Sequence, residues 1–124
     1  MEQQCALISV VDDDVSSRES LPGLLEALGF AAMPFASAED FLGSTALANT
    51  WCLILDVSMP GMSGPQLQGE LSRRHLKIPI IFITGDCDRD LRAKLLARGA
   101  IECLFKPVGE RALRAALDCV IRSA

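Results

Sequence analysis

The sequence predicts an α/β domain in which a parallel, five-stranded sheet carries helices on both faces. Two observations lead to this prediction. Short apolar runs alternate with helical patterns from end to end, and five such pairs fit into 124 residues. The run at residues 78–83 is almost wholly apolar, as expected of a strand covered on both faces. The length is that of one domain, so residues 1–124 are expected to form a single unit.

The expected elements alternate strictly along the chain. Strands are expected at residues 7–11, 31–35, 51–55, 78–83 and 101–105. Helices are expected after the acidic triplet 12–14 as far as about residue 28, and at 38–42, 64–75, 89–98 and 110–121.

Local signals mark several helix ends. Asp14 and Ser37 are suited to be N-caps, and Gly29 and Gly99 are stop signals. Pro22 lies inside the first helical pattern, where proline removes a backbone donor and clashes with the preceding turn. We therefore expect a kink there, or a helix that restarts with Pro22 in its first turn.

Composition excludes several classes of function. The net charge of −4 makes the chain a poor counter-charge for nucleic acid, so no direct nucleic-acid binding is expected. No apolar run reaches the length of a membrane span and the N-terminus lacks a basic start, so a cytoplasmic protein without a membrane segment is expected. The five cysteines are scattered without a C-x-x-C pair, which is typical of reduced thiols.

Polar side chains follow the ends of the expected strands. The first strand is followed by Asp12 and Asp13, the third by Asp56, the fourth by Thr84 and the fifth by Lys106. In an open parallel sheet the carboxyl ends of the strands lie at one edge, where ligands bind. We therefore expect these five side chains to converge on one pocket.

The chemistry of this set favours a divalent cation and a phosphoryl group. Three carboxylates in one pocket repel one another, and a cation removes that conflict. Oxygen ligands without clustered His or Cys favour Mg²⁺ or Mn²⁺, and Mg²⁺ binds through carboxylates together with phosphate oxygens. Lys106 offers a positive charge and Thr84 a hydroxyl donor to a group on Asp56, and a carboxylate can act as the nucleophile that forms an acyl phosphate.

Four motifs resemble one known family. They are V-V-D-D-D at 10–14, L-D-V-S-M-P-G-M-S-G at 55–64, I-T-G at 83–85 and F-K-P at 105–107. Together they resemble the receiver domains of two-component response regulators, over essentially the whole chain. The stretches S-A-E-D-F-L and I-T-G-D look most like the branch in which a helix-turn-helix DNA-binding domain follows the receiver. The resemblance implies a flavodoxin-like fold with strand order 2-1-3-4-5.

The resemblance also implies a role for each acid. Asp56 would be the phosphoacceptor. Asp13 and Asp56 would bind Mg²⁺ through their side chains, and Ser58 would bind it through its backbone carbonyl. Asp12 would act largely through metal-bound water.

Further roles follow for the groups around the phosphoryl. Lys106 would pair with it and Thr84 would swing inward to hydrogen-bond it. The Lys106–Pro107 peptide bond is expected to be cis, which is credible only because the second residue is proline.

The resemblance implies partners as well. The donor would be a phosphohistidine on a sensor histidine kinase, and the only catalysis would be the domain's own phosphorylation and dephosphorylation. The change of shape would control an effector, a DNA-binding domain absent from this chain, and through it transcription. A homodimer through the fourth helix, fifth strand and fifth helix is a candidate assembly.

One position departs from the family pattern. Many receivers have Tyr or Phe three residues before the lysine, and here that residue is Cys103, in a chain without tyrosine. We therefore expect signalling to depend on Thr84 and residues 84–90, or on Phe105. Asp86 lies near the mouth of the site and is expected to tune the lifetime of the phosphorylated state.

Three other functions compete with the receiver. A small aspartyl-phosphate phosphatase usually has a second acid two residues after the nucleophile, where this chain has Ser58. A phosphorylation-independent interaction module is favoured by Cys103 and disfavoured by the complete set of acids, Thr84 and Lys106. A flavodoxin-like cofactor domain lacks support, because three acids and no Gly-rich loop follow the first strand.

The fourth expected helix is basic. Its cations are Arg89, Arg92, Lys94 and Arg98. They indicate either a solvated face or a docking surface for a kinase, an effector domain or a second receiver.

Overall fold

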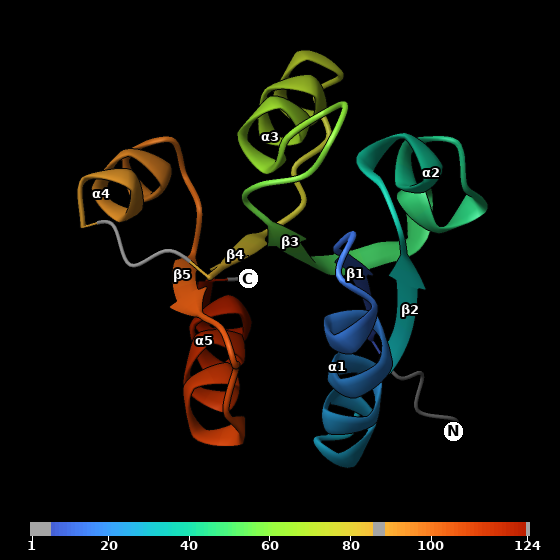
Figure 1. Ribbon diagram of the computed structural model, residues 1–124, viewed down its shortest axis with the longest axis vertical. Coiled ribbons are helices and arrows are strands. Elements are labelled where there is room, and N and C mark those ends of the chain that lie inside the picture. The colour runs from blue at the N-terminus through green and yellow to red at the C-terminus, as the bar shows by residue number, and fades with distance from the viewer. Residues whose placement is uncertain (1–5, 86–88, 124) are drawn as a thin grey trace.

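The computed structural model describes residues 6–85 and 89–123, and these form one parallel sheet flanked by helices (Figure 1). The strand order is β2-β1-β3-β4-β5, and every neighbouring pair is parallel. The strands are β1 (Leu7–Val11), β2 (Ala31–Phe35), β3 (Thr50–Asp56), β4 (Ile80–Thr84) and β5 (Glu102–Phe105). The helices are α1 (Val15–Ala27), α2 (Ala38–Leu42), α3 (Gly64–Arg73), α4 (Arg89–Ala97) and α5 (Glu110–Ser123), with a 3₁₀ helix η1 (Thr45–Asn49) before β3. The predicted fold class and strand order are confirmed.

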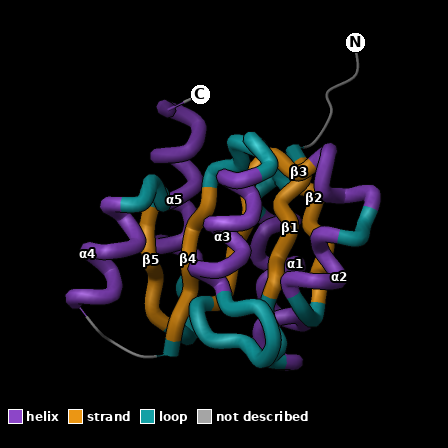
Figure 2. The backbone as a smooth tube through the Cα atoms, turned by 90° about the horizontal axis from the view of Figure 1, so that it is seen from above, coloured by secondary structure: helices purple, strands orange, loops and turns teal. Residues whose placement is uncertain are grey.

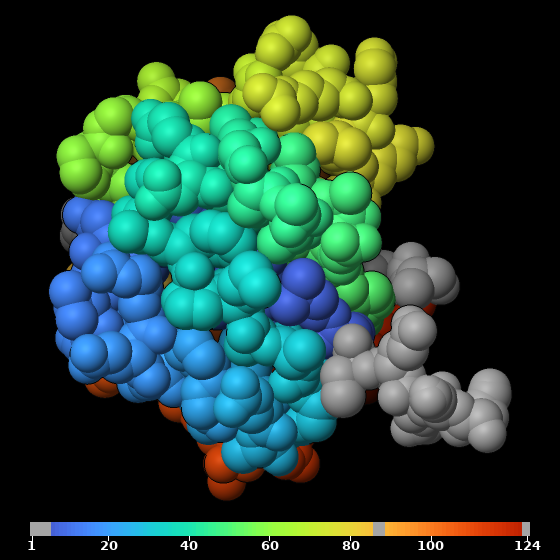
Figure 3. Space-filling model, turned by 90° about the vertical axis from the view of Figure 1, so that its right-hand side faces the viewer, coloured from blue at the N-terminus to red at the C-terminus, as the bar shows by residue number. Residues whose placement is uncertain are grey.

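The helices divide into two layers. Helices α1 and α5 cover one face of the sheet, and α2, α3 and α4 cover the other (Figures 1 and 2). Alternate residues of β3 supply both cores, because successive strand side chains point to opposite faces. Leu53 and Leu55 pack with α2, α3 and α4, whereas Cys52 and Ile54 pack with α1 and α5. On the side of β2, α2 and η1 form one continuous surface (Figure 3).

Capping residues set several helix boundaries. Asp14 is the N-cap of α1 and its side chain accepts a hydrogen bond from the Ser16 amide at 3.1 Å. Ser37 caps α2 in the same way through the Asp40 amide at 3.0 Å. Both N-caps were predicted. Gly29 follows α1 with a φ of +97°, a conformation that favours glycine, so the predicted stop signal is confirmed.

Of the two outcomes predicted at Pro22, the restarted helix is wrong and the kink stays a prediction. Helix α1 continues from Val15 to Ala27 with Pro22 in its interior. Proline costs this helix a hydrogen bond, roughly 3 kcal/mol in a helix interior. Leu21 and Leu25, on either side of it, are buried against the sheet. Burying two leucines contributes about 3–6 kcal/mol, so packing offsets the local penalty.

The cysteines of the described residues differ in exposure. Cys52 and Cys103 are buried free cysteines, and Cys119 is an exposed one. Burial raises the pKa of the Cys52 thiol to about 12, so this cysteine is a poor nucleophile at neutral pH. Among residues 6–85 and 89–123 there is no helix with the length and apolarity that a membrane crossing requires.

The order of the strands brings the carboxyl ends of β1 and β3 side by side. Strand β1 has β2 on one side and β3 on the other, so the connections leave in opposite directions between β1 and β3. Ligands of open α/β sheets bind at such a switch point, outside the carboxyl ends of the strands. Asp12 follows β1 there and Asp56 ends β3.

Candidate functional site

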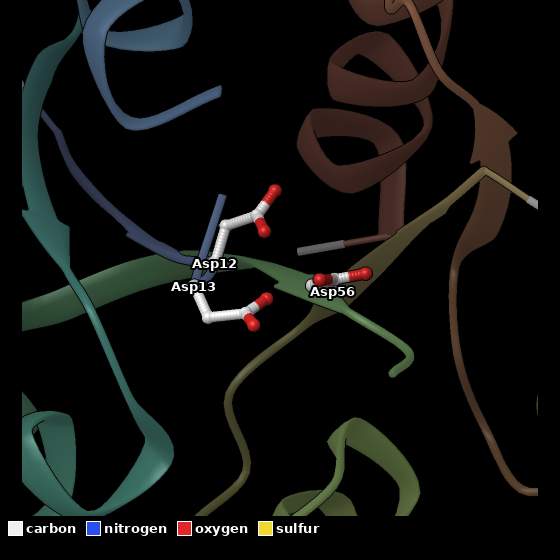
Figure 4. A group of neighbouring side chains, drawn as sticks. All are labelled: Asp12, Asp13 and Asp56. Atoms are coloured by element: carbon white, nitrogen blue, oxygen red, sulfur yellow. The ribbon is translucent and has the colours of Figure 1, made fainter. Parts of the chain in front are cut away.

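Three carboxylates meet at the carboxyl edge of the sheet (Figure 4). Asp12 and Asp13 extend from consecutive positions after β1, and Asp56 extends from the last position of β3. Each offers one carboxylate oxygen, and these atoms all lie within 4.8 Å of one another. Asp12 is fully buried, Asp56 is 5% exposed and Asp13 is exposed, so the cluster reaches from the interior to solvent. The predicted convergence of these acids is what the structure shows.

Both carboxylate oxygens of Asp12 and its backbone carbonyl have polar contacts. Its Oδ1 accepts a hydrogen bond from the Asp14 amide at 3.0 Å. Its backbone carbonyl accepts one from Arg18 Nη1 of α1, also at 3.0 Å. Its Oδ2 lies 2.9 Å from Lys106 Nζ, in an ion pair. The Asp12 carboxylate therefore has a backbone amide at one oxygen and a counter-charge at the other.

Lys106 brings its ammonium group into the acid cluster. Besides the contact with Asp12, Nζ lies 3.6 Å from Asp56 Oδ2 and 3.9 Å from Asp14 Oδ2. The backbone fixes this approach, because the Lys106 amide donates to the Thr84 carbonyl at 2.8 Å. The Lys106–Pro107 peptide bond is cis, the isomer that the resemblance implied. Asp14, expected only as an N-cap, thus also faces the site.

The pKa values of the two buried acids are shifted in opposite directions. Burial, followed by the contact with Asp12 and its charge, raises the pKa of Asp56 to about 7, against the lowering effect of Lys106. Burial also acts on Asp12, but Lys106, the Asp14 amide and Asp56 together hold its pKa below the usual value. Burial opposes the charge of Lys106, yet Asp12, Asp56 and Asp14 raise its pKa. Asp56 is therefore the acid that retains a proton more readily, because a single lysine does not neutralise both carboxylates.

The donor set fits a hard divalent cation. The cluster consists of carboxylates alone, without His or Cys, which favours Mg²⁺ or Mn²⁺ over zinc. A cation would displace the proton that Asp56 retains and would compensate the remaining charge.

The other predicted site residues differ in exposure and in the elements that carry them. Thr84 is the last residue of β4 and 4% exposed, and Ser58 is exposed, two residues after Asp56. Cys103 is 4% exposed and belongs to the core beneath α4, in register with Phe82 of β4. The switch position of other receivers is therefore a packed thiol here. Asp86 lies outside the described residues.

Sequence reasoning missed the importance of Gly64. A Cβ at this position would lie 2.3 Å from the Asp56 carbonyl oxygen, so only glycine fits without moving the backbone. The Gly64 amide also donates to the Val57 carbonyl at 3.0 Å. The segment after Asp56 therefore doubles back against the strand that it has just left. The available signal was a second glycine three residues after the turn at Gly61.

Comparison with known proteins decides the family. The model of the response regulator receiver domain matches residues 8–118. This chain belongs to that family. It is a receiver domain of two-component signalling, and such domains are regulators of signalling rather than classical enzymes.

Relatives support the assignment. Nodulation protein W of Bradyrhizobium diazoefficiens is 42% identical over 116 residues, which are 94% of this chain and 50% of that protein. The transcriptional regulatory protein TdiR of Thauera aromatica is 38% identical over 114 residues, 92% of this chain and 50% of TdiR. A structure of the response regulator StyR is 40% identical, with a TM-score of 0.86 over 97% of this chain and 61% of that one. The chain spans about half the length of the curated relatives that it matches.

Proposed function

We propose that this receiver accepts a phosphoryl group on Asp56, with Mg²⁺ bound, from a phosphohistidine of a sensor histidine kinase. One observation carries the proposal. Lys106 Nζ lies 2.9 Å from Asp12 and 3.6 Å from Asp56, inside a group of carboxylates whose oxygens lie within 4.8 Å of one another. Such a site concentrates negative charge beside one fixed cation, and it tolerates an anionic adduct once a divalent cation is present.

Asp56 is the acceptor because the other two acids are poorly placed. Asp12 is fully buried and its two oxygens face the Asp14 amide and Lys106. Asp13 is exposed, and a metal ligand there reaches solvent water. Asp56 lies beside both of them at the end of β3, with Lys106 near one oxygen (Figure 4). It is the carboxylate from which an adduct can contact both a bound cation and the ammonium group.

The transfer is a substitution at phosphorus. An Asp56 carboxylate oxygen forms the new bond to phosphorus as the bond from phosphorus to the imidazole nitrogen breaks, and the imidazole keeps the electron pair and takes a proton. Lys106 neutralises a transferred oxygen and the Thr84 hydroxyl donates to another. Asp13, Asp56 and the Ser58 carbonyl would hold Mg²⁺, with Asp12 acting through a bound water. Bound Mg²⁺ supplies the positive charge that lets two anions approach.

The signal leaves the site through Thr84 or through Phe105. Cys103 cannot reproduce an aromatic rotation, so the change passes through Thr84 and residues 84–90, or through Phe105, which is 39% exposed at the end of β5. Residues 1–124 act as one receiver unit, and if they are part of a longer protein, the effector domain that controls transcription lies outside them. The net charge of −4 assigns any contact with DNA to that domain. Two receivers pair through the face formed by α4, β5 and α5.

A phosphodonor assay tests the proposal. The protein is incubated with acetyl phosphate and Mg²⁺, and its intact mass is measured. A gain of about 80 Da, one phosphoryl group, is expected in the wild type and in Asp40→Asn, and not in Asp56→Asn. Asp40 is a matched control because it is an exposed acid on α2, outside the cluster.

Other outcomes point to the competing functions. Turnover of many phosphate esters by the wild type favours the phosphatase. No adduct and no affinity for Mg²⁺ favour an interaction module that works without phosphorylation.

A further inference from the structure

The segment at residues 57–63 connects Asp56 to α3, and both of its ends are fixed. At one end Val57 donates its amide to the Ile83 carbonyl of β4 at 3.0 Å. At the other end Gly64 returns to the Val57 carbonyl and packs against the Asp56 backbone. Ser58, whose carbonyl is the proposed metal ligand, lies between these anchors. Its direction depends on what holds the middle of the segment.

A carboxylate from another helix holds that middle. Glu39 of α2 accepts a hydrogen bond from the Met62 amide through Oε2 at 3.1 Å, across 23 residues of sequence. The neighbouring Gly61 has a φ of +76°, and a Cβ there would lie 2.9 Å from the same oxygen. The backbone at Gly61 and Met62 therefore closes around Glu39 Oε2. In Figure 3 the lime-green residues of this segment lie beside the blue-green residues of α2.

Helix α2 is a firm base for this contact. Ser37 caps it through the Asp40 amide, and two of its own residues, Ala38 and Phe41, are fully buried. The Phe41 ring also packs edge-on against Phe35 of β2, with ring centroids 5.4 Å apart. The backbone of Glu39 is thereby fixed relative to the sheet, and its exposed side chain reaches outward to the segment.

We propose that Glu39 is a positioning residue for the cation, and this inference rests on the proposed function. By accepting the Met62 amide, Glu39 fixes the middle of residues 57–63 and with it the direction of the Ser58 carbonyl. Glu39 is not one of the three clustered carboxylates, so it acts through the segment rather than as a ligand. Residues that orient a metal ligand in this way commonly tune affinity for the metal.

Three variants separate the hydrogen bond from the charge. Glu39→Ala removes both, and Glu39→Gln keeps an acceptor oxygen and removes the charge. Asp40→Ala is the matched control: it removes the adjacent acid in the same first turn of α2, which has the same effect on the helix dipole. Affinity for Mg²⁺ is measured by isothermal titration calorimetry. Unfolding in urea, followed by the fluorescence of Trp51, shows that each variant is folded.

Affinity for Mg²⁺ should follow the hydrogen bond. We expect Glu39→Ala to bind Mg²⁺ about threefold to tenfold more weakly than the wild type, at or below the lower end of the range for such orienting residues. Glu39→Gln should stay within about twofold of the wild type, because an amide oxygen still accepts the Met62 amide. Asp40→Ala should be unchanged.

The outcomes distinguish this inference from the function on which it rests. If the wild type itself does not bind Mg²⁺, the proposed function fails. If the wild type binds and Glu39→Ala equals Asp40→Ala, only the role of Glu39 is overturned. The role is also overturned if Glu39→Gln is as weak as Glu39→Ala, since charge and not position would then matter.

A second variant tests the contact at Gly61. Gly61→Ala places a methyl group against Glu39 Oε2 and strains a left-handed residue, so it should weaken Mg²⁺ binding. In a Glu39→Ala background the same substitution should cost less affinity, because the oxygen is gone. Equal losses in both backgrounds would show that the two residues are independent and would overturn the proposal.

Discussion

The interior of β3 and the end of β3 are almost equally buried, yet they differ in kind. Leu53, Ile54 and Leu55 are fully buried and pack against apolar neighbours on both faces. Asp56, the next residue, is 5% exposed, and burial together with the neighbouring Asp12 carboxylate raises its pKa. Leu55 and Asp56 are therefore almost equally buried, but burial is favourable for the leucine and unfavourable for the charged aspartate.

This difference assigns separate roles to the two regions. The strand interiors stabilise the domain, because burial of apolar surface is favourable without any partner. The strand ends hold unbalanced charge, which costs stability until a cation arrives. Removing an apolar side chain from the interior should therefore lower the free energy of unfolding, whereas removing an acid from a strand end should raise it. The following experiments measure that contrast.

The largest loss in the free energy of unfolding is expected for a substitution in a strand interior. Phe82 of β4 is fully buried in the core beneath α2, α3 and α4. Phe82→Ala should lower the free energy of unfolding by about 3–5 kcal/mol, because it removes the ring and leaves a cavity. Urea unfolding followed by Trp51 fluorescence measures the loss. Ile121→Ala is the control: this side chain is 53% exposed, and a change within about 0.5 kcal/mol is expected.

Removing the positive charge of Lys106 should lower the free energy of unfolding by a smaller amount. Lys106→Met leaves the buried Asp12 carboxylate without its counter-charge, and we expect a loss of about 2 kcal/mol at pH 7.5. The pKa of Asp12 is depressed in the folded protein, so the stability that this carboxylate contributes is present above its unfolded value and is lost as the pH falls. The loss caused by Lys106→Met should therefore shrink in acid.

The same variant should gain affinity for Mg²⁺, because no ammonium group then competes for the carboxylates. Calorimetric titration measures this. Weaker binding of Mg²⁺ by Lys106→Met would contradict the view that lysine and metal neutralise the same charges.

Removing one acid should stabilise the metal-free domain. The folded pKa of Asp56 is about 7, against 3.8 for an ordinary aspartate, so its contribution to stability is complete below 3.8 and is lost as the pH rises through 7. Asp56→Asn does not titrate, and at pH 7.5 it should be more stable than the wild type by on the order of 2 kcal/mol. The gain should diminish toward pH 4 and in the presence of saturating Mg²⁺. A loss of stability at pH 7.5 would contradict the proposed charge conflict.

The smallest effect is expected at a surface ion pair. Arg92 Nη2 of α4 lies 2.6 Å from Glu102 Oε1 of β5, and both side chains are partly exposed. Arg92→Ala should change the free energy of unfolding by at most about 1 kcal/mol, because solvent screens such pairs. A change comparable to that of Lys106→Met would show that exposure does not separate the two ion pairs.

Most of the fold could be predicted because its signals are local. Strands β1 and β2 have the predicted bounds, since each apolar run is flanked by turn or cap residues. The 3₁₀ helix η1 was not predicted, because a run as short as 45–49 shows no periodicity. At Pro22 the local rule was overridden by tertiary burial, which sequence periodicity does not measure.

The residues that form the site could be predicted from the sequence, but the pKa values of its acids could not. Parallel topology alone brings Asp12, Asp56 and Lys106 to one edge. The unequal pKa values of the two acids depend on which of them lies nearer to Lys106 Nζ, and that follows only from coordinates. The contact between Glu39 and Met62 left no signal, because it joins a surface side chain to a backbone amide.

The most direct test is a crystal structure with Mg²⁺ and beryllofluoride, a mimic of the phosphoryl group. The proposal predicts beryllium bound to an Asp56 oxygen, a fluoride within hydrogen-bond distance of Lys106 Nζ, and Mg²⁺ in contact with Asp13, Asp56 and the Ser58 carbonyl. An adduct on another residue, or Lys106 turned away from a fully occupied site, would contradict it.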